Sequence, residues 1–127
     1  MKIKDCQIKD VLECDDNKSI VEIAQILKKN NSRHVIITDN KKPVGIISIT
    51  DISNRVVAEG KDPKKTKAKD IMTKNIFYKD IESLLSDTYV EMVKNNMIFC
   101  PVTQNNKLIG GVELREVMGK LSQIKLK

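Results

Sequence analysis

Hydrophobic positions in the first half of the chain follow two different spacings. Five apolar residues recur every three or four positions and predict an amphipathic helix over about 19–30: Ile20, Ile23, Ala24, Ile26 and Leu27. Short apolar runs predict strands at 11–14, 35–38 and 44–47, and a polar stretch at 39–42 predicts a tight turn. The first half is therefore expected to run strand, helix, strand, strand, followed by a second helix.

That second helix is predicted to begin directly at the end of the third strand. Ser48 breaks the apolar run, and Ile52, Val56 and Val57 follow at helical spacing to a stop at Gly60. The start of a helix presents unpaired N–H groups and the positive end of the helix dipole. Such a place suits an anion such as phosphate.

Polar side chains gather at this helix start. Ser48 and Thr50 supply hydroxyls, and Asp51 supplies acceptors that could hold a sugar diol, as acidic residues do in other nucleotide-binding folds. Gly45 would let the backbone approach a neighbour or a ligand closely. The spacing Ser48-x-x-Asp51 also fits a capping box, in which both side chains serve the helix itself. The two interpretations do not exclude each other.

The whole pattern then occurs a second time. Gly110 lies 65 positions after Gly45, and the same offset relates the Asn95-Asn96 and Asn30-Asn31 pairs. Strands are predicted at 76–78, 100–103 and 108–112, with helices over about 84–93 and from about Leu114. A gapless internal duplication of this length predicts two β-α-β-β-α units related by a pseudo-twofold axis. We expect repeat 1 at 2–60, a linker at 61–67, repeat 2 at 68–121 and a tail at 122–127.

Four segments carry a resemblance to a known family; they are 35–39, 45–52, 70–73 and 101–102. In this order, and duplicated, they resemble a tandem of CBS domains, the Bateman module. The resemblance implies an α/β fold of two pseudo-symmetric β-α-β-β-α CBS repeats packed as one module. It also implies a regulatory module that binds adenosine-containing ligands such as AMP, ADP, ATP or S-adenosylmethionine, with no cofactor required.

The resemblance also implies which residues bind. Asp51 would hold the ribose hydroxyls, with Ser48 and Thr50 beside the ribose and phosphate. Arg33 and His34 would meet the phosphate, for which a guanidinium is a natural partner. The base would enter an apolar cleft lined by Ile46, Thr73, Ile76, Ile98, Phe99 and Cys100.

Repeat 2 departs from this pattern. Glu113, Arg115 and Glu116 replace the serine, threonine and aspartate of repeat 1, and Ile98 and Phe99 stand at the positions of its phosphate-binding pair. A carboxylate where phosphate should lie predicts a weak or empty second site.

Composition narrows the possible classes. Hydrophobic residues make up 40% of the 127 positions and aromatic residues 3%, so the core should be aliphatic. A net charge of +6 favours anionic ligands without selecting nucleic acid. The three cysteines, Cys6, Cys14 and Cys100, form no C-x-x-C pair, which argues against a disulfide framework or a zinc site. No apolar run approaches the ~18 residues of a membrane span, so a cytoplasmic location is expected.

The same residues argue against several functions. The single histidine and the absence of a Gly-rich phosphate loop or nucleophile motif argue against an enzyme. Five lysines near the linker have no interleaved aromatic residues, which argues against nucleic-acid binding; they are Lys61, Lys64, Lys65, Lys67 and Lys69. We expect a regulatory module that signals to an unidentified effector protein. The alternative is a ligand-free dimerisation module.

Apolar helix positions expected to be exposed predict a homodimer; they are Val56, Val57, Val117 and Leu121.

Overall fold

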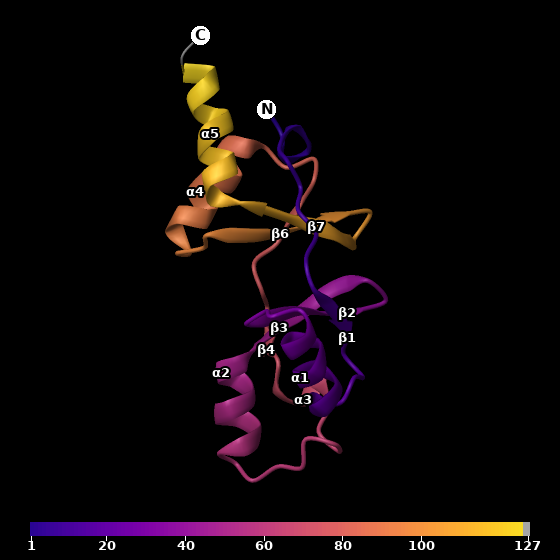
Figure 1. The fold of residues 1–127 in the computed structure, drawn as a ribbon. Helices are drawn as coiled ribbons and strands as arrows, with labels where there is room; N and C mark the ends of the chain where they lie inside the picture. Colours follow the sequence, from indigo (N-terminus) through magenta and orange to yellow (C-terminus); the bar gives the residue numbers. More distant parts are fainter. Residues whose placement is uncertain (126–127) are drawn as a thin grey trace. The chain divides into compact units, whose positions relative to one another are not determined.

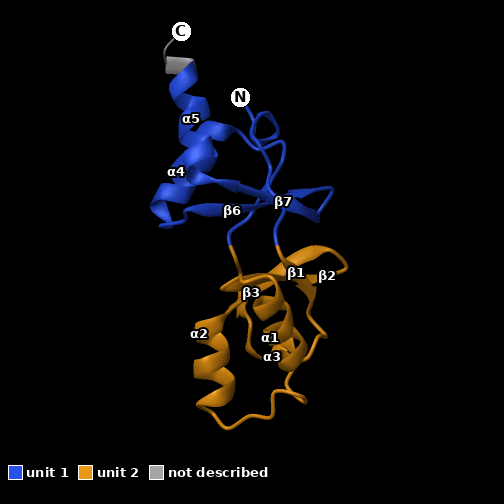
Figure 2. Ribbon diagram, in the orientation of Figure 1, with its two compact units in different colours: residues 1–11, 77–127 blue, residues 12–76 orange. Residues whose placement is uncertain are grey.

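The computed structural model describes residues 1–125, which form two compact units (Figures 1 and 2). Unit 2 comprises Leu12–Ile76, and unit 1 comprises Met1–Val11 together with the chain from Phe77 onward. Each unit therefore contains most of one sequence repeat and the opening segment of the other. The predicted boundaries at 60 and 68 describe the duplication in the sequence but not the way the chain divides in space.

Unit 2 is built on a four-stranded sheet in the order β1-β2-β3-β4. Its strands are β1 (Glu13–Asp15), β2 (His34–Asp39), β3 (Lys42–Ser48) and β4 (Thr73–Lys74). Its helices are α1 (Ile20–Lys29), α2 (Ile49–Ile52), the π-helical turn η2 (Ser53–Val57) and α3 (Ala68–Ile71). The strand β1 runs parallel to β2, and the two following pairs are antiparallel. The core forms where the helices cover the sheet face bearing Val35, Ile37 and Ile47.

Unit 1 repeats this plan with a three-stranded sheet in the order β5-β6-β7. Its strands are β5 (Lys79–Asp80), β6 (Phe99–Gln104) and β7 (Lys107–Glu113), and its helices are η1 (Ile3–Asp5), α4 (Leu85–Lys94) and α5 (Leu114–Lys125). The predicted strand at 76–78 was placed too early, because only Lys79 and Asp80 pair with β6. The predicted tail at 122–127 is also wrong in part, because α5 continues through Lys125; residues 126–127 lie outside the described residues.

The two hairpins show why the predicted turns form. Asn40 and Lys41, between β2 and β3, both have positive φ, at 50° and 71°. Asn105 and Asn106 do the same between β6 and β7, at 54° and 64°. Two central residues with positive φ are the signature of a type I′ turn, which matches the twist of a hairpin and suits asparagine. The turns therefore fix the register of each antiparallel pair.

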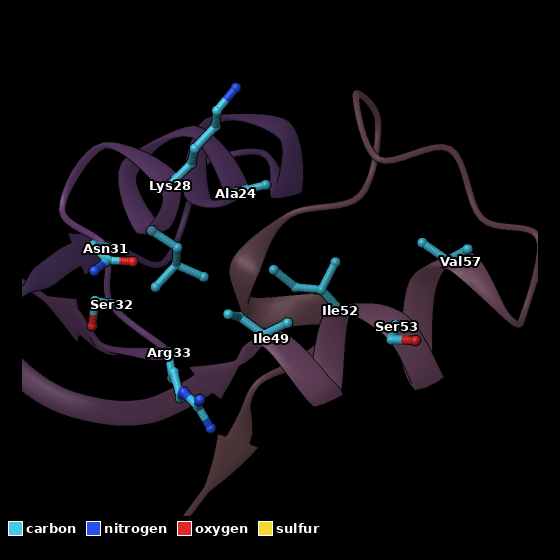
Figure 3. A pocket seen from close by; sticks show the side chains of 10 residues that line it. Ala24, Lys28, Asn31, Ser32, Arg33, Ile49, Ile52, Ser53 and Val57 are labelled. Carbon is cyan, nitrogen blue, oxygen red and sulfur yellow. The ribbon is translucent and has the colours of Figure 1, made fainter.

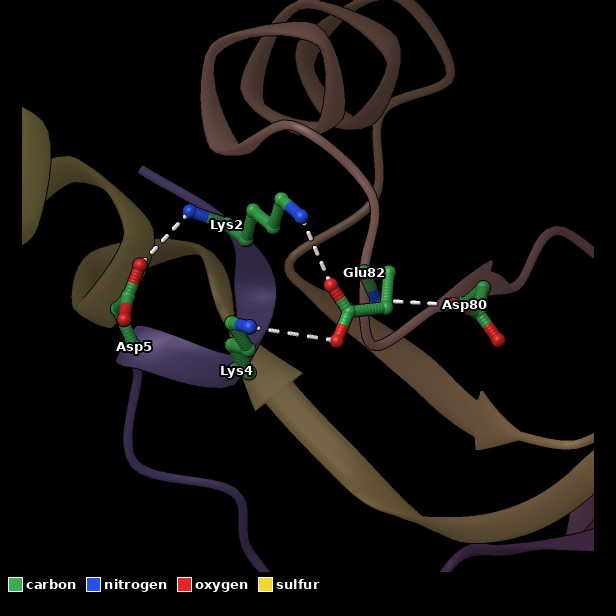
Figure 4. Close-up of polar contacts among 5 residues, drawn as sticks. All are labelled: Lys2, Lys4, Asp5, Asp80 and Glu82. Carbon is green, nitrogen blue, oxygen red and sulfur yellow. Dashed lines mark hydrogen bonds and ion pairs between the residues drawn. The ribbon is translucent and has the colours of Figure 1, made fainter.

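The opening segment of the chain is held in unit 1 by several polar contacts (Figure 4). The Nζ atoms of Lys2 and Lys4 lie 2.9 and 3.4 Å from the two carboxylate oxygens of Glu82. Hydrogen bonds from these lysines lower the pKa of Glu82. The backbone of Lys9 also exchanges hydrogen bonds of 2.8 and 2.9 Å with Gly111 on β7. These contacts attach residues 1–11 to repeat 2 rather than to repeat 1.

The basic linker is ordered along its backbone. Carbonyls of Pro63 and Thr66 accept hydrogen bonds from Val21 and Ile20 at the start of α1. Ser19 and Glu22 complete that helix start with a capping box. The first N–H groups of α1 are thus used within the fold.

Of the four apolar helix positions expected to be exposed, the structure confirms only one. Val56 and Val117 were predicted to be exposed, but both are fully buried, because their helices turn these positions toward the cores of their units. Val57 is indeed 70% exposed, whereas Leu121 is partly buried against the core of unit 1. The three cysteines are free and buried, and burial raises the pKa of Cys6 to about 11 and that of Cys100 to about 12. No helix in the described part of the chain has the length and apolar character needed to cross a membrane.

Candidate functional site

The capping box predicted from the sequence forms at the end of β3. Ser48 Oγ accepts a hydrogen bond of 3.1 Å from the Asp51 backbone N–H, and Asp51 Oδ2 accepts one of 2.9 Å from the Ser48 N–H. The Ile49 N–H is also used, because it donates to the carbonyl of Arg33 at 2.9 Å. The α-helical segment that follows has only four residues. It continues directly into the π-helical turn η2, and of its first N–H groups those of Ile49 and Asp51 are already used within the fold.

Strand pairing gathers several predicted residues around this cap. His34 lies opposite Ser48 on the neighbouring strand, and Ile46 lies opposite Thr73. Thr50 is exposed in the first turn of α2. Four predicted residues thus occupy three adjacent strands, β2, β3 and β4, and one of them, Ser48, is hydrogen-bonded to Asp51. Ile76 is the last residue of the same unit.

Arg33 is not part of this group. Its side chain lines a different cavity of about 640 Å³ between α1 and α2, together with Lys28, Ile49, Ile52 and Val57 (Figure 3). Ser48, Thr50 and Asp51 do not line that cavity. Arg33 lies in a bend just before β2, whereas His34 is the first residue of that strand. The predicted contact of both residues with one ligand phosphate stays a prediction.

A cation that the sequence analysis missed lies beside Asp51. The Nη2 atom of Arg55 is 3.7 Å from Asp51 Oδ1, and its Nη1 donates a hydrogen bond of 2.6 Å to the carbonyl of Ile71. The Asp51 side chain is 19% exposed and that of Arg55 is 44% exposed. The signal was the i,i+4 spacing of an acidic and a basic residue on one helix face.

The remaining three predicted residues belong to unit 1. Cys100 is fully buried in the core of that unit, whereas Ile98 is 80% exposed. The Phe99 ring packs so closely over Gly111 that a Cβ atom there would lie 2.0 Å from it. Their contribution to a cleft with Ile46 and Thr73 stays a prediction.

The counterpart of the cap in repeat 2 is occupied by the protein's own groups. Glu116 Oε2 accepts a hydrogen bond of 2.8 Å from the Gln7 backbone N–H. Glu113 forms ion pairs with Lys9 and Arg115, and the hydrogen bond from Lys9 is the main cause of its lowered pKa. The cavity that these five residues line has a volume of about 300 Å³. Both carboxylates are therefore already committed to cations or N–H donors.

Comparison with known proteins gives this arrangement a context. A family model described as the CBS domain matches the chain twice, over residues 3–58 and 68–123. An uncharacterized protein of Methanopyrus kandleri is 29% identical over 112 residues, covering 87% of this chain and 57% of that protein. The chain spans only 22% and 23% of two further relatives.

Two solved structures are similar over nearly the whole chain. Hypoxic Response Protein I with two coordinated zinc ions has a TM-score of 0.78 at 18% identity, with 94% of this chain and 98% of that chain covered. The CBS domain pair of protein MJ0100, in complex with 5′-methylthioadenosine and S-adenosyl-L-methionine, has a TM-score of 0.67 at 29% identity, with 98% of both chains covered.

The first likeness concerns the fold alone. Within residues 1–125 no group of three or more His, Cys, Asp and Glu side chains is arranged to hold a metal ion. The two family matches, by contrast, coincide with the two sequence repeats and include the Ser48–Asp51 cap and its altered counterpart at Glu113–Glu116. The chain belongs to the CBS domain family and carries two CBS domains in tandem.

Proposed function

We propose that this CBS pair is a regulatory module that binds one adenosine-containing ligand, of the AMP, ADP, ATP or S-adenosylmethionine class, and signals to a partner protein. The observation that carries the proposal is the half-buried Asp51 carboxylate in the first turn of α2, directly after β3. Of its two oxygens, Oδ2 serves the cap, and Oδ1 has Arg55 at 3.7 Å. A carboxylate has about four acceptor positions, so acceptors remain for the two hydroxyls of a ribose.

Likeness to a ligand-bound relative supports the ligand class. The MJ0100 pair, 29% identical over 98% of both chains, was solved with two adenosine compounds. Neither compound carries a phosphate, and both carry a ribose. A site organised around a ribose-binding carboxylate suits such ligands as well as nucleotides. The module acts by binding rather than catalysis, and the effector protein it controls is a separate chain or a further domain.

A thermal-shift screen tests the proposal. The compounds are AMP, ADP, ATP, S-adenosylmethionine and 5′-methylthioadenosine. A ligand at about 100 times its dissociation constant should stabilise the fold by roughly 2.7 kcal/mol. For a chain of this size we expect the melting temperature to rise by about 10 °C. If none of these compounds at millimolar concentration changes the melting temperature by about a degree, the ligand-free dimerisation module becomes the better account.

Exposed apolar side chains in both units predict that the module is a homodimer. In unit 2 they are Ile49 and Val57, which border the cavity of Figure 3. In unit 1 they include Val90, Val93, Ile98 and Met118, all at least 47% exposed. Closed twofold association is the commonest way to cover such faces.

Size-exclusion chromatography with light scattering should give about twice the 14.4 kDa chain mass. Replacing Val57 and Ile98 by aspartate should shift the protein toward monomer. Exchanging the exposed but polar Gln25 for aspartate is the matched control and should leave the mass unchanged. A parent protein that is monomeric at tens of micromolar would refute the prediction.

A further inference from the structure

Arg55 lies in an unusual turn immediately after the cap. From Ser53 to Val57 the chain forms a π-helix, with the Ala58 N–H donating to the Ser53 carbonyl at 2.9 Å. Single π-helical turns inside helices occur frequently at functional sites. This turn buries Val56 completely in the core of unit 2 and leaves Arg55 on the surface, on the side of Asp51.

The guanidinium of Arg55 connects two parts of unit 2 that are distant in sequence. On one side its Nη2 lies 3.7 Å from Asp51 Oδ1. On the other side its Nη1 donates to the carbonyl of Ile71 at 2.6 Å, where α3 ends. The segment after Ile71 forms β4 and contains Thr73, which pairs with Ile46 on β3. One side chain thus links the cap carboxylate to the segment that carries further predicted ligand contacts.

Other charged side chains surround Arg55. It lines a cavity of about 360 Å³ with Glu59, Lys61 and Asp70. Among the described residues, its guanidinium forms an ion pair with Asp51. The planar guanidinium can engage a carboxylate and a carbonyl at once, because its donors diverge in a fixed fork. A lysine ammonium at the same place is a single point charge and would hold one partner well.

We propose that Arg55 is a positioning residue of the repeat 1 site: it orients the Asp51 carboxylate toward the ligand and ties it to the backbone at Ile71. This inference rests on the proposed function for its effect on affinity, and on the structure alone for the contact with Ile71. Repeat 2 has Lys120 at the corresponding position, 65 residues later, and supplies a matched control.

The test is calorimetric titration with AMP and with S-adenosylmethionine on the parent, Arg55→Gln, Arg55→Lys and Lys120→Gln proteins. We expect Arg55→Gln to weaken binding about five- to tenfold, Arg55→Lys to recover part of that loss, and Lys120→Gln to bind like the parent. In an Asp51→Ala background, titrated to millimolar ligand, Arg55→Gln should cause no further loss, because interacting residues are not additive. An Arg55 with only a structural role would lower the melting temperature but leave affinity unchanged well below it.

Two results would overturn the proposal. One is parent-like affinity in Arg55→Gln, and the other is an equal loss in the Asp51→Ala background. If the parent binds none of the five compounds of the thermal-shift screen, the proposed function fails, and hydrogen exchange decides the positioning contact separately. Faster exchange of the Met72 amide in Arg55→Gln, with no change in Lys120→Gln, supports the link to Ile71; unchanged exchange of Met72 refutes it.

Discussion

Replacing Asp51 by alanine is expected to weaken binding of an adenosine ligand at least tenfold. The carboxylate is short, 19% exposed, and fixed by the Ser48 N–H at 2.9 Å, so it is already oriented before a ligand arrives. Hydrogen bonds to a charged acceptor contribute roughly 1.5–3 kcal/mol each. Loss of one of them exceeds the ~1.4 kcal/mol that corresponds to a factor of ten in affinity.

The same substitution removes half of the capping box, which costs about 1 kcal/mol of stability. Affinity should therefore be measured by calorimetry well below the melting temperature of the variant. Glu116→Ala is the matched control, because Glu116 occupies the equivalent position but is bonded to the Gln7 N–H. An Asp51→Ala protein that binds as tightly as the parent would contradict the assignment of the site.

Gly110→Ala is expected to destabilise the protein strongly. A Cβ atom at this position would lie 2.5 Å from the carbonyl oxygen of Lys9 and 2.7 Å from a methyl group of Ile8. The φ angle of 156° is also one that side chains other than glycine rarely adopt. The obstructing oxygen belongs to Lys9, whose backbone N–H and carbonyl both form hydrogen bonds with Gly111. It therefore cannot move without breaking those hydrogen bonds. Overpacking costs about 1–3 kcal/mol, and the lost hydrogen bonds add about 1 kcal/mol each.

We therefore expect the melting temperature of Gly110→Ala to fall by about 10 °C or more in calorimetry or circular dichroism. Gly119→Ala is the matched control, because Gly119 lies within α5 and a Cβ atom there meets nothing within 4 Å. That substitution should be neutral or should stabilise the helix by up to about 1 kcal/mol. A Gly110→Ala protein that melts with the parent would show that the Lys9 segment does not lie against β7.

The regular elements were predictable because their signals are local. The helical spacing of Ile20, Ile23 and Leu27 identified α1, and all three side chains are buried in the core of unit 2. The Ser48-x-x-Asp51 spacing identified a capping box that forms with both hydrogen bonds. Gly45 was expected to permit close approach, and a Cβ atom there would lie 2.9 Å from the Thr73 carbonyl oxygen.

In contrast, the sequence did not predict that the opening segment of each repeat belongs to the unit formed mainly by the other repeat. β4 has only two residues, and nothing in a two-residue strand specifies which distant strand it will pair with. The gapless offset of 65 residues reflects a duplication of the sequence, and it assigns Thr73 to repeat 2. In space, however, the pairing of Thr73 with Ile46 places Thr73 in unit 2.

The site was predicted less completely, because its geometry depends on the direction of single side chains. Arg33 and His34 are adjacent in sequence, yet Arg33 lines the cavity between α1 and α2 and His34 lies opposite Ser48. The π-helical turn could not be predicted from the sequence either, since the apolar residues of 53–57 have the spacing of an ordinary α-helix. That turn buries Val56, which was expected to be exposed, and leaves Arg55 beside Asp51.

The central claim, a single adenosine site built on repeat 1, is tested most directly by the stoichiometry of binding. Calorimetric titration of the parent with the most stabilising adenosine compound should give about one ligand per chain. The carboxylates of repeat 2 are already bonded to Lys9, Arg115 and the Gln7 N–H, so that repeat should contribute no comparable site. Two equivalent sites per chain, or a single site whose affinity depends on Glu116 rather than Asp51, would contradict the account.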